Sequence, residues 1–324
     1  MDLRRLMELC MCPAPQGGEQ QAKRLIRGWL PEGLCVREDA AGSLIVCKPG
    51  KRPGLMLMAG LSQSTILVTG RKKGGVWKIQ PLGAGKDLKT LDGWRVSDAK
   101  GAQGIIAVRE GELFLEDAVS VEAGTSLTLQ PDWRQDERSV TCSGIGDRIG
   151  CWMLAELLRT LPLAESEIVC VFLAQEALNS RTAELAAGNA DIAAAIRWGS
   201  APARDANITG VPVEAGKGPA VRLRERYAST DGRMLDFIRQ LASERRIPYQ
   251  YELLELSVTG LYTAQYGRCG VVVGGVDVPE EKGKILIEDL EAAGALLSAL
   301  AGRRDALLTA LQSLPAVAHL PSPV

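Results

Sequence analysis

The sequence predicts an α/β protein, in which a mostly parallel sheet with helices on both faces is interrupted by an inserted small β-barrel-like domain. After residue 140, continuous apolar segments alternate with amphipathic ones, a pattern typical of parallel strands covered by helices. Between residues 65 and 140, short β-rich segments alternate with glycine turns, which indicates a small barrel or sandwich. We therefore expect an α/β domain of residues 1–64 plus 141–315, an inserted β domain of residues 65–140, and a loose tail of residues 316–324.

The expected helices carry apolar residues at intervals of three and four, which places these residues on one helical face. Cys-Pro-Ala-Pro-Gln-Gly-Gly at 12–18 separates the first two helices, because proline and glycine interrupt helical hydrogen bonding. In chain order, we expect helices at residues 3–11, 19–30, 148–161, 182–188, 231–246 and 287–302.

The expected strands are short apolar or alternating segments rich in Val, Ile and Leu. Those of the α/β domain are residues 33–38, 43–48, 55–59, 167–174, 191–197, 219–225, 249–256 and 269–275. Those of the inserted domain are residues 65–70, 75–83, 104–117 and 125–131.

Composition excludes several classes of protein. The net charge is −1 and the pI is about 6.1, so no overall field attracts nucleic acid or an anionic membrane. No segment has the ~18 apolar residues of a membrane helix, and the first residues lack the apolar centre of a signal peptide. The eight cysteines have no paired spacing and several lie in apolar segments, so we expect reduced core cysteines in a soluble, cytoplasmic protein.

Ligands of open α/β sheets bind beyond the carboxyl ends of the strands. Five segments are expected to follow or end strands in this way: residues 60–64, 143–148, 174–179, 197–200 and 274–281. Taken in this order, they resemble the tetrahedral, cellulase-M-like family of glutamyl or deblocking aminopeptidases, which are dinuclear metallopeptidases. Further matches extend over nearly the whole chain: GDRIGCWMLAELLR at 146–159, VFLAQEALNSRTAELA at 171–186, GKGPAV at 216–221 and RIPYQYELLE at 246–255.

The resemblance implies a zinc-aminopeptidase-like fold, two zinc or cobalt ions, and a homo-oligomer assembled through the inserted β domain. It also implies five metal-ligand positions. In this chain they are occupied by Gly60, Gly146, Ala177, Arg197 and Asp277. Glycine, alanine and arginine do not ligate zinc, whereas a catalytic zinc needs about three protein ligands. We therefore expect no metal and no other cofactor.

The same resemblance places other residues in the pocket. Glu176 falls on the general-base position, where it would be vestigial, because no metal-bound water remains to be activated. Ser62 and Gln63 stand where the family has two carboxylates, while Asp147 and Arg148 match retained residues. We hypothesise that the Arg197 guanidinium pairs with Glu176 or Asp277 in place of the missing cations. The alternative is that Arg197 extends into solvent.

Other chemistries have less support. The only histidine, His319, lies in the expected tail, so a Ser-His or Cys-His pair would need that tail in the cleft. No phosphate-binding loop occurs. The favoured interpretation is an aminopeptidase-family homologue without peptidase activity, retained for peptide or small-molecule binding, for scaffolding, or for assembly with itself or an active paralogue. The alternatives are an active metal-dependent aminopeptidase with non-standard ligands, and an unrelated reaction that uses Glu176, Asp147 and Arg148.

Overall fold

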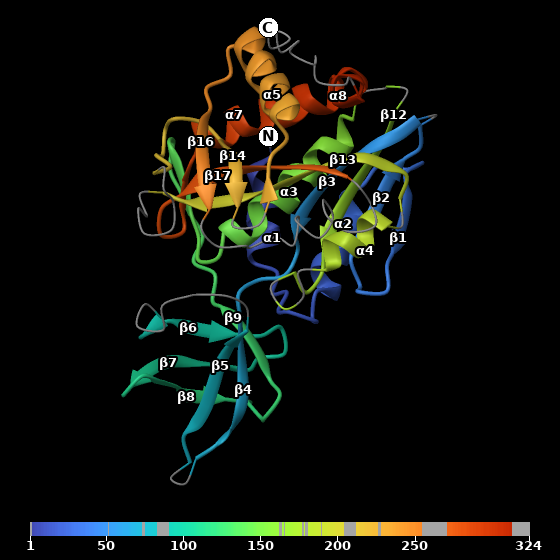
Figure 1. The fold of residues 1–324 in the computed structure, drawn as a ribbon. Helices are drawn as coiled ribbons and strands as arrows, with labels where there is room; N and C mark the ends of the chain where they lie inside the picture. The colour runs from blue at the N-terminus through green and yellow to red at the C-terminus, as the bar shows by residue number, and fades with distance from the viewer. Residues whose placement is uncertain are drawn as a thin grey trace, which may run out of the picture.

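A nine-stranded sheet forms the centre of the α/β part of this computed structural model (Figure 1). The structure describes residues 2–50, 52–72, 75–82, 91–161, 164, 166–176, 178, 181–188, 190–203, 212–225, 228–254 and 271–312. In spatial order the strands are β1 (Cys35–Glu38), β2 (Leu44–Lys48), β12 (Ser166–Leu173), β3 (Arg52–Gly60), β13 (Ile192–Pro202), β17 (Val272–Glu280), β14 (Ala220–Glu225) and β15 (Ala228–Ser229), and β16 (Gln250–Leu254) pairs with β14. The central strands β12, β3, β13 and β17 are parallel, and antiparallel pairs lie toward the edges.

Helices cover both faces of the sheet, as predicted, but unevenly. Their bounds are α1 (Leu3–Cys10), α2 (Gln20–Trp29), α3 (Gly146–Arg159), α4 (Thr182–Gly188), α5 (Gly232–Arg245), α7 (Ile287–Gly302) and α8 (Arg304–Gln312). Alternate residues of β3 separate into two cores: Leu55 and Leu57 pack with α1, α2, α3, α5, α7 and α8, whereas Met56 and Met58 pack with α4. This alternation explains why residues 55–59 of β3 are all apolar, because both faces of the strand are buried there.

The inserted strands close into a six-stranded barrel that projects from the α/β part (Figure 1). They are β4 (Thr65–Arg71), β5 (Trp77–Leu82), β6 (Arg95–Ser97), β7 (Gln103–Arg109), β8 (Glu112–Val119) and β9 (Ser126–Leu129), and the pairing of β9 with β4 closes the ring. Glu110 and Gly111 connect β7 to β8 with positive φ at both residues, as a two-residue hairpin turn requires. Each of the six described strands therefore pairs with a neighbour on both sides.

The structure corrects several sequence-based expectations. The strand expected at 191–197 continues to Pro202, and the strand expected at 269–275 is found as β17 and continues to Glu280. Arg197 and Asp277 therefore lie inside strands and not at their ends, because the polar and glycine residues that suggested termination pair with each other across β13 and β17. A three-stranded sheet of β10 (Arg134–Gln135), β11 (Ser139–Thr141) and β18 (Lys284–Leu286), together with β6 and α8, was not predicted.

The remaining expectations concern cysteines and membranes. The seven described cysteines are free thiols, and all except the exposed Cys35 are buried, which confirms the prediction of reduced core cysteines for this part of the chain. None of the described helices is long and apolar enough to cross a membrane. The expected tail, with His319, lies outside the described residues.

Candidate functional site

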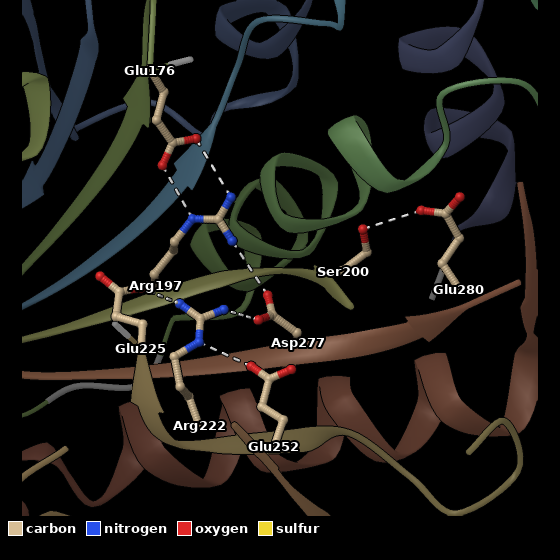
Figure 2. Close-up of polar contacts among 8 residues, drawn as sticks. All are labelled: Glu176, Arg197, Ser200, Arg222, Glu225, Glu252, Asp277 and Glu280. Carbon is tan, nitrogen blue, oxygen red and sulfur yellow. Dashed lines mark hydrogen bonds and ion pairs between the residues drawn. The ribbon is translucent and has the colours of Figure 1, made fainter. Parts of the chain in front are cut away.

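Two arginines and four carboxyl groups form a cluster on one face of the sheet, over β13, β17 and β14 (Figure 2). We call it the arginine–carboxylate cluster; it comprises Glu176, Arg197, Arg222, Glu225, Glu252 and Asp277. Arg197 lies in β13 on the face that carries the α4 core, because its register partner in β3 is Met58. The cluster thus continues the α4 side of the sheet with charged groups in place of apolar ones.

The Arg197 guanidinium connects Glu176, which follows β12, to Asp277 in β17. Its Nε donates to Glu176 Oε1 at 3.1 Å and its Nη2 donates to Glu176 Oε2 at 3.5 Å. Its Nη1 donates to Asp277 Oδ1 at 3.3 Å. The side chains of Arg197 and Glu176 are only 16% and 11% exposed, so the hypothesis that Arg197 extends into solvent is wrong and both hypothesised ion pairs are present.

Arg222 forms the inner half of the cluster. Its Nε donates to Glu252 Oε1 at 3.0 Å and its Nη1 donates to Glu225 Oε2 at 3.1 Å. Its Nη2 donates to Asp277 Oδ2, so the Asp277 carboxylate bridges the two guanidiniums (Figure 2). Arg222 and its three carboxyl partners are each 3% exposed or less. Such a buried arrangement is stable only while every charge keeps its partners.

Glycines make room for both guanidiniums. Gly275 is the register partner of Arg197, and a Cβ at Gly275 would lie 3.1 Å from Arg222 Nη1. Gly199 is the register partner of Asp277, and a Cβ at Gly199 would lie 2.7 Å from Asp277 Oδ1 and still closer to Arg197 Nη1. The glycines that suggested strand ends in the sequence therefore serve to accommodate the arginines above the sheet.

The surroundings of Glu252 in the cluster shift its pKa. Burial, followed by the neighbouring negative charge of Asp277, raises the pKa of Glu252 well above its ordinary value, although Arg222 opposes the shift. Glu252 Oε2 is buried and accepts no hydrogen bond in the structure. These surroundings favour the protonated form of Glu252 more than the surroundings of an exposed glutamate would.

Carboxylates also fill the spaces beside Gly60 and Gly146, two positions at which the family resemblance places a metal ligand. An ideal Cβ at Gly60 would lie within 3.0 Å of Glu176 Oε2, closer than real Cβ atoms approach other atoms. At Gly146 the same space is taken by Glu280 Oε2 and Ser200 Oγ, and Ser200 Oγ donates to Glu280 at 3.2 Å (Figure 2). A larger side chain at either glycine would have to displace these groups.

Three predicted pocket residues lie near the site but are engaged elsewhere. Gln63 is 3% exposed, and its Oε1 accepts from the Ala14 N–H at 3.0 Å. Asp147 Oδ2 accepts from the Ser64 N–H at 2.8 Å. Arg148 is fully buried and donates to the carbonyls of Leu61 and Cys12, each at 2.6 Å. The Arg148 guanidinium therefore joins two backbone segments.

Other parts of the site were missed or lie outside the described residues. Sequence reasoning did not identify Arg222, Glu225, Glu252, Ser200 or Glu280; the available signal was the charged residues within the otherwise apolar segments 219–225 and 249–256. Ala177 lies outside the described residues. Among the residues that the structure describes, no three His, Cys, Asp or Glu side chains are grouped so that they could hold a metal ion.

Comparisons with known proteins agree with the fold. The family model described as M42 glutamyl aminopeptidase matches residues 115–283, slightly more than half of the chain. A relative from Acetivibrio thermocellus, provisionally named an aminopeptidase, is 25% identical over 297 residues, which cover 81% of this chain and 86% of the relative.

Two solved structures are similar throughout. A TET aminopeptidase from a marine sediment Thaumarchaeota archaeon has a TM-score of 0.84 at 21% identity, over 95% of this chain and 99% of that chain. The Pyrococcus horikoshii TET1 peptidase, which can assemble into a tetrahedron or a large octahedral shell, has a TM-score of 0.80 at 20% identity, over 92% of this chain and 98% of that chain.

Proposed function

The chain belongs to the M42 glutamyl aminopeptidase family, and from that premise we propose that it is a member that has lost its two-metal site and its peptidase activity. The proposal depends on one observation above all: the Arg197 guanidinium lies between the carboxylates of Glu176 and Asp277. A fixed positive charge occupies the region in which the resemblance places divalent cations. The retained fold would then serve to bind peptides or small molecules, to act as a scaffold, or to assemble with other chains.

The described side chains do not fit two metal ions. Gly60 and Gly146 offer no ligand, and the space for a larger side chain at either position is filled. Asp277 is the one described carboxylate at the five ligand positions, and both of its oxygens accept from arginines. A divalent ion there would have to displace guanidiniums and accept too few ligands for a catalytic zinc site.

Hydrolysis by the family mechanism would be lost for the same reason. A resident metal would supply a nucleophilic water at neutral pH and polarise the scissile carbonyl. Without it, the general-base position retains only Glu176, whose two oxygens accept hydrogen bonds from Arg197. Glu176 in this arrangement holds the site together and has no activated water to deprotonate.

Assembly with identical or related chains is part of the proposal. The similar Pyrococcus horikoshii peptidase forms closed shells, and this chain keeps a complete barrel of the same overall fold. We expect a homo-oligomer, with an active paralogue as a further partner. The free cysteines fit the cytoplasmic location that the sequence predicts. Light scattering after size-exclusion chromatography tests the assembly: a single species of 34.7 kDa would contradict it.

Hydrolysis of aminoacyl p-nitroanilides, with and without added zinc or cobalt, tests the loss of activity. We expect the wild-type protein to match the Glu176→Gln variant, which removes the remaining candidate base but keeps an amide oxygen near Arg197. Metal-stimulated turnover that Glu176→Gln abolishes would establish the alternative, an active aminopeptidase with non-standard ligands. Binding is tested separately with fluorescein-labelled peptides of varied N-terminal residue, for which we expect saturable binding without added metal.

A further inference from the structure

The segment between α1 and α2 runs along the connection from β3 to β4 and forms reciprocal hydrogen bonds with it. The Gln63 N–H donates to the Ala14 carbonyl at 2.8 Å, and the Ala14 N–H returns a bond to Gln63 Oε1 at 3.0 Å. Two residues further on, the Gln16 N–H donates to Thr65 Oγ1 at 2.9 Å. The N-terminal segment is therefore fixed against the strand end beside the candidate site.

Glu19, which ends this segment, connects it to the site. Its carboxylate is 4% exposed, and Oε1 accepts from the Gly17 N–H at 2.9 Å, from Ser62 Oγ at 2.6 Å and from the Gln175 N–H at 3.1 Å. The Gln175 N–H is shared, because Ser62 Oγ also accepts from it at 2.8 Å. Hydrogen bonds to a charged acceptor are stronger than neutral ones, so Gln175 is firmly held.

Gln175 in turn determines the direction of the next residue, Glu176. The φ of Gln175 is +54°, in the left-handed region that residues other than glycine seldom adopt. Its side-chain Nε2 donates to the Ala41 carbonyl at 3.2 Å. A backbone in this conformation persists only when its surroundings enforce it, and here the enforcing contacts come from Glu19 and Ser62. If they were removed, the backbone would relax and the Glu176 carboxylate would turn away from Arg197.

We propose that Glu19 is a positioning residue, which holds the Gln175 backbone so that the Glu176 carboxylate meets the Arg197 guanidinium. This inference rests on the proposed function, in which the Glu176–Arg197 pair replaces the cations of the site. It assigns a role to the N-terminal segment. It also explains why a serine stands at position 62, where the family has a carboxylate: the smaller hydroxyl lets the buried Glu19 reach Gln175.

The test measures how fast phenylglyoxal modifies Arg197 in the full-length protein, followed by peptide mass spectrometry. Arg222, 3% exposed, is the internal reference and should stay unmodified. Glu176→Ala calibrates the readout by removing the partner carboxyl group entirely. We expect Glu19→Leu to accelerate Arg197 modification about tenfold, the scale of a lost hydrogen bond to a charged group. Glu19→Gln should remain near the wild-type rate, because its amide oxygen still accepts.

Lys23→Met is the matched control. Lys23 is buried in α2 and anchors the same region by donating to Glu38 Oε2 at 2.6 Å and to the Gly42 carbonyl at 3.0 Å, and neither of these acceptors belongs to Gln175. We expect it to leave the Arg197 rate unchanged. An acceleration equal to that of Glu19→Leu would mean that loosening α2 is sufficient, and would overturn the assigned role.

Each result separates this inference from the proposed function. If Glu176→Ala does not accelerate the modification of Arg197, the ion pair does not protect the guanidinium and the proposed function loses its main support. If Glu176→Ala accelerates it but Glu19→Leu does not, only the role of Glu19 is wrong. Should Glu19→Leu fail to fold, Ser62→Ala replaces it: removing one of the two acceptors of the Gln175 N–H should give a smaller acceleration, and no acceleration would overturn the inference.

Discussion

Replacing Arg197 by methionine is the perturbation that most clearly exposes the energetics of the site. Methionine keeps much of the aliphatic volume but leaves Glu176 without its guanidinium partner, while Asp277 keeps Arg222. Breaking a buried ion pair costs about 3–5 kcal/mol, and the partial exposure of Arg197 and Glu176 reduces the expected loss to about 2–4 kcal/mol.

Urea unfolding followed by tryptophan fluorescence at one protein concentration measures this loss. The double variant Glu176→Gln/Arg197→Met should recover most of the stability, because it also removes the unpaired carboxylate. Arg24→Met, at an exposed position of α2, is the control and should change stability by less than about 0.5 kcal/mol. If Arg197→Met cost no more than this control, Arg197 would not be a structural substitute for a cation.

Three further predictions follow from the same contacts. Gly199→Ala should lower the free energy of unfolding by about 1–3 kcal/mol, because its methyl group would overlap the Arg197 guanidinium. Urea unfolding should show that this loss largely disappears in an Arg197→Met background, and full additivity of the two substitutions would contradict the explanation. The Arg233 side chain lowers the pKa of Asp231, so this carboxylate stabilises the fold above its ordinary pKa of 3.8 and the contribution is lost as pH falls below that value. Asp231→Asn should therefore lower the free energy of unfolding by about 0.5 kcal/mol at pH 7, and an equal loss near pH 3 would contradict the ion pair. Cys35 is exposed while the other described cysteines are buried, so Cys35→Ser should remove one fast-reacting thiol in a titration of the native protein, and an unchanged fast phase would place that reactivity elsewhere.

The sequence was sufficient to predict most of the architecture. Residues 55–59 of β3 and 168–173 of β12 are apolar throughout because both faces of each segment are buried, and that pattern is visible without a structure. The barrel was predicted from glycine-separated β segments, but residues 104–117 were expected as one strand and form the β7–β8 hairpin, with Glu110 and Gly111 at the turn. The β10–β11–β18 sheet was not predicted, since its strands are two or three residues long and pair segments far apart in the chain.

The site was predictable only in part. The resemblance placed the cationic Arg197 beside Glu176 and Asp277, and its pairing with carboxylates could be predicted from that position. Arg222 escaped prediction because two of its three partners come from other strands, and a charged residue in an apolar segment does not reveal which residues neutralise it. Gly199 and Gly275 were misread as strand ends, since a glycine that accommodates a neighbouring side chain has the same sequence signal as one that ends a strand.

The metal content of the purified protein tests the central claim most directly. The protein is prepared without chelators, incubated with zinc or cobalt, freed of unbound ions, and measured by inductively coupled plasma mass spectrometry. Because Arg197 occupies the space between Glu176 and Asp277, the account predicts well below one ion per chain after either metal. Retention of one or more ions per chain, reduced by a Glu176→Gln substitution, would contradict it.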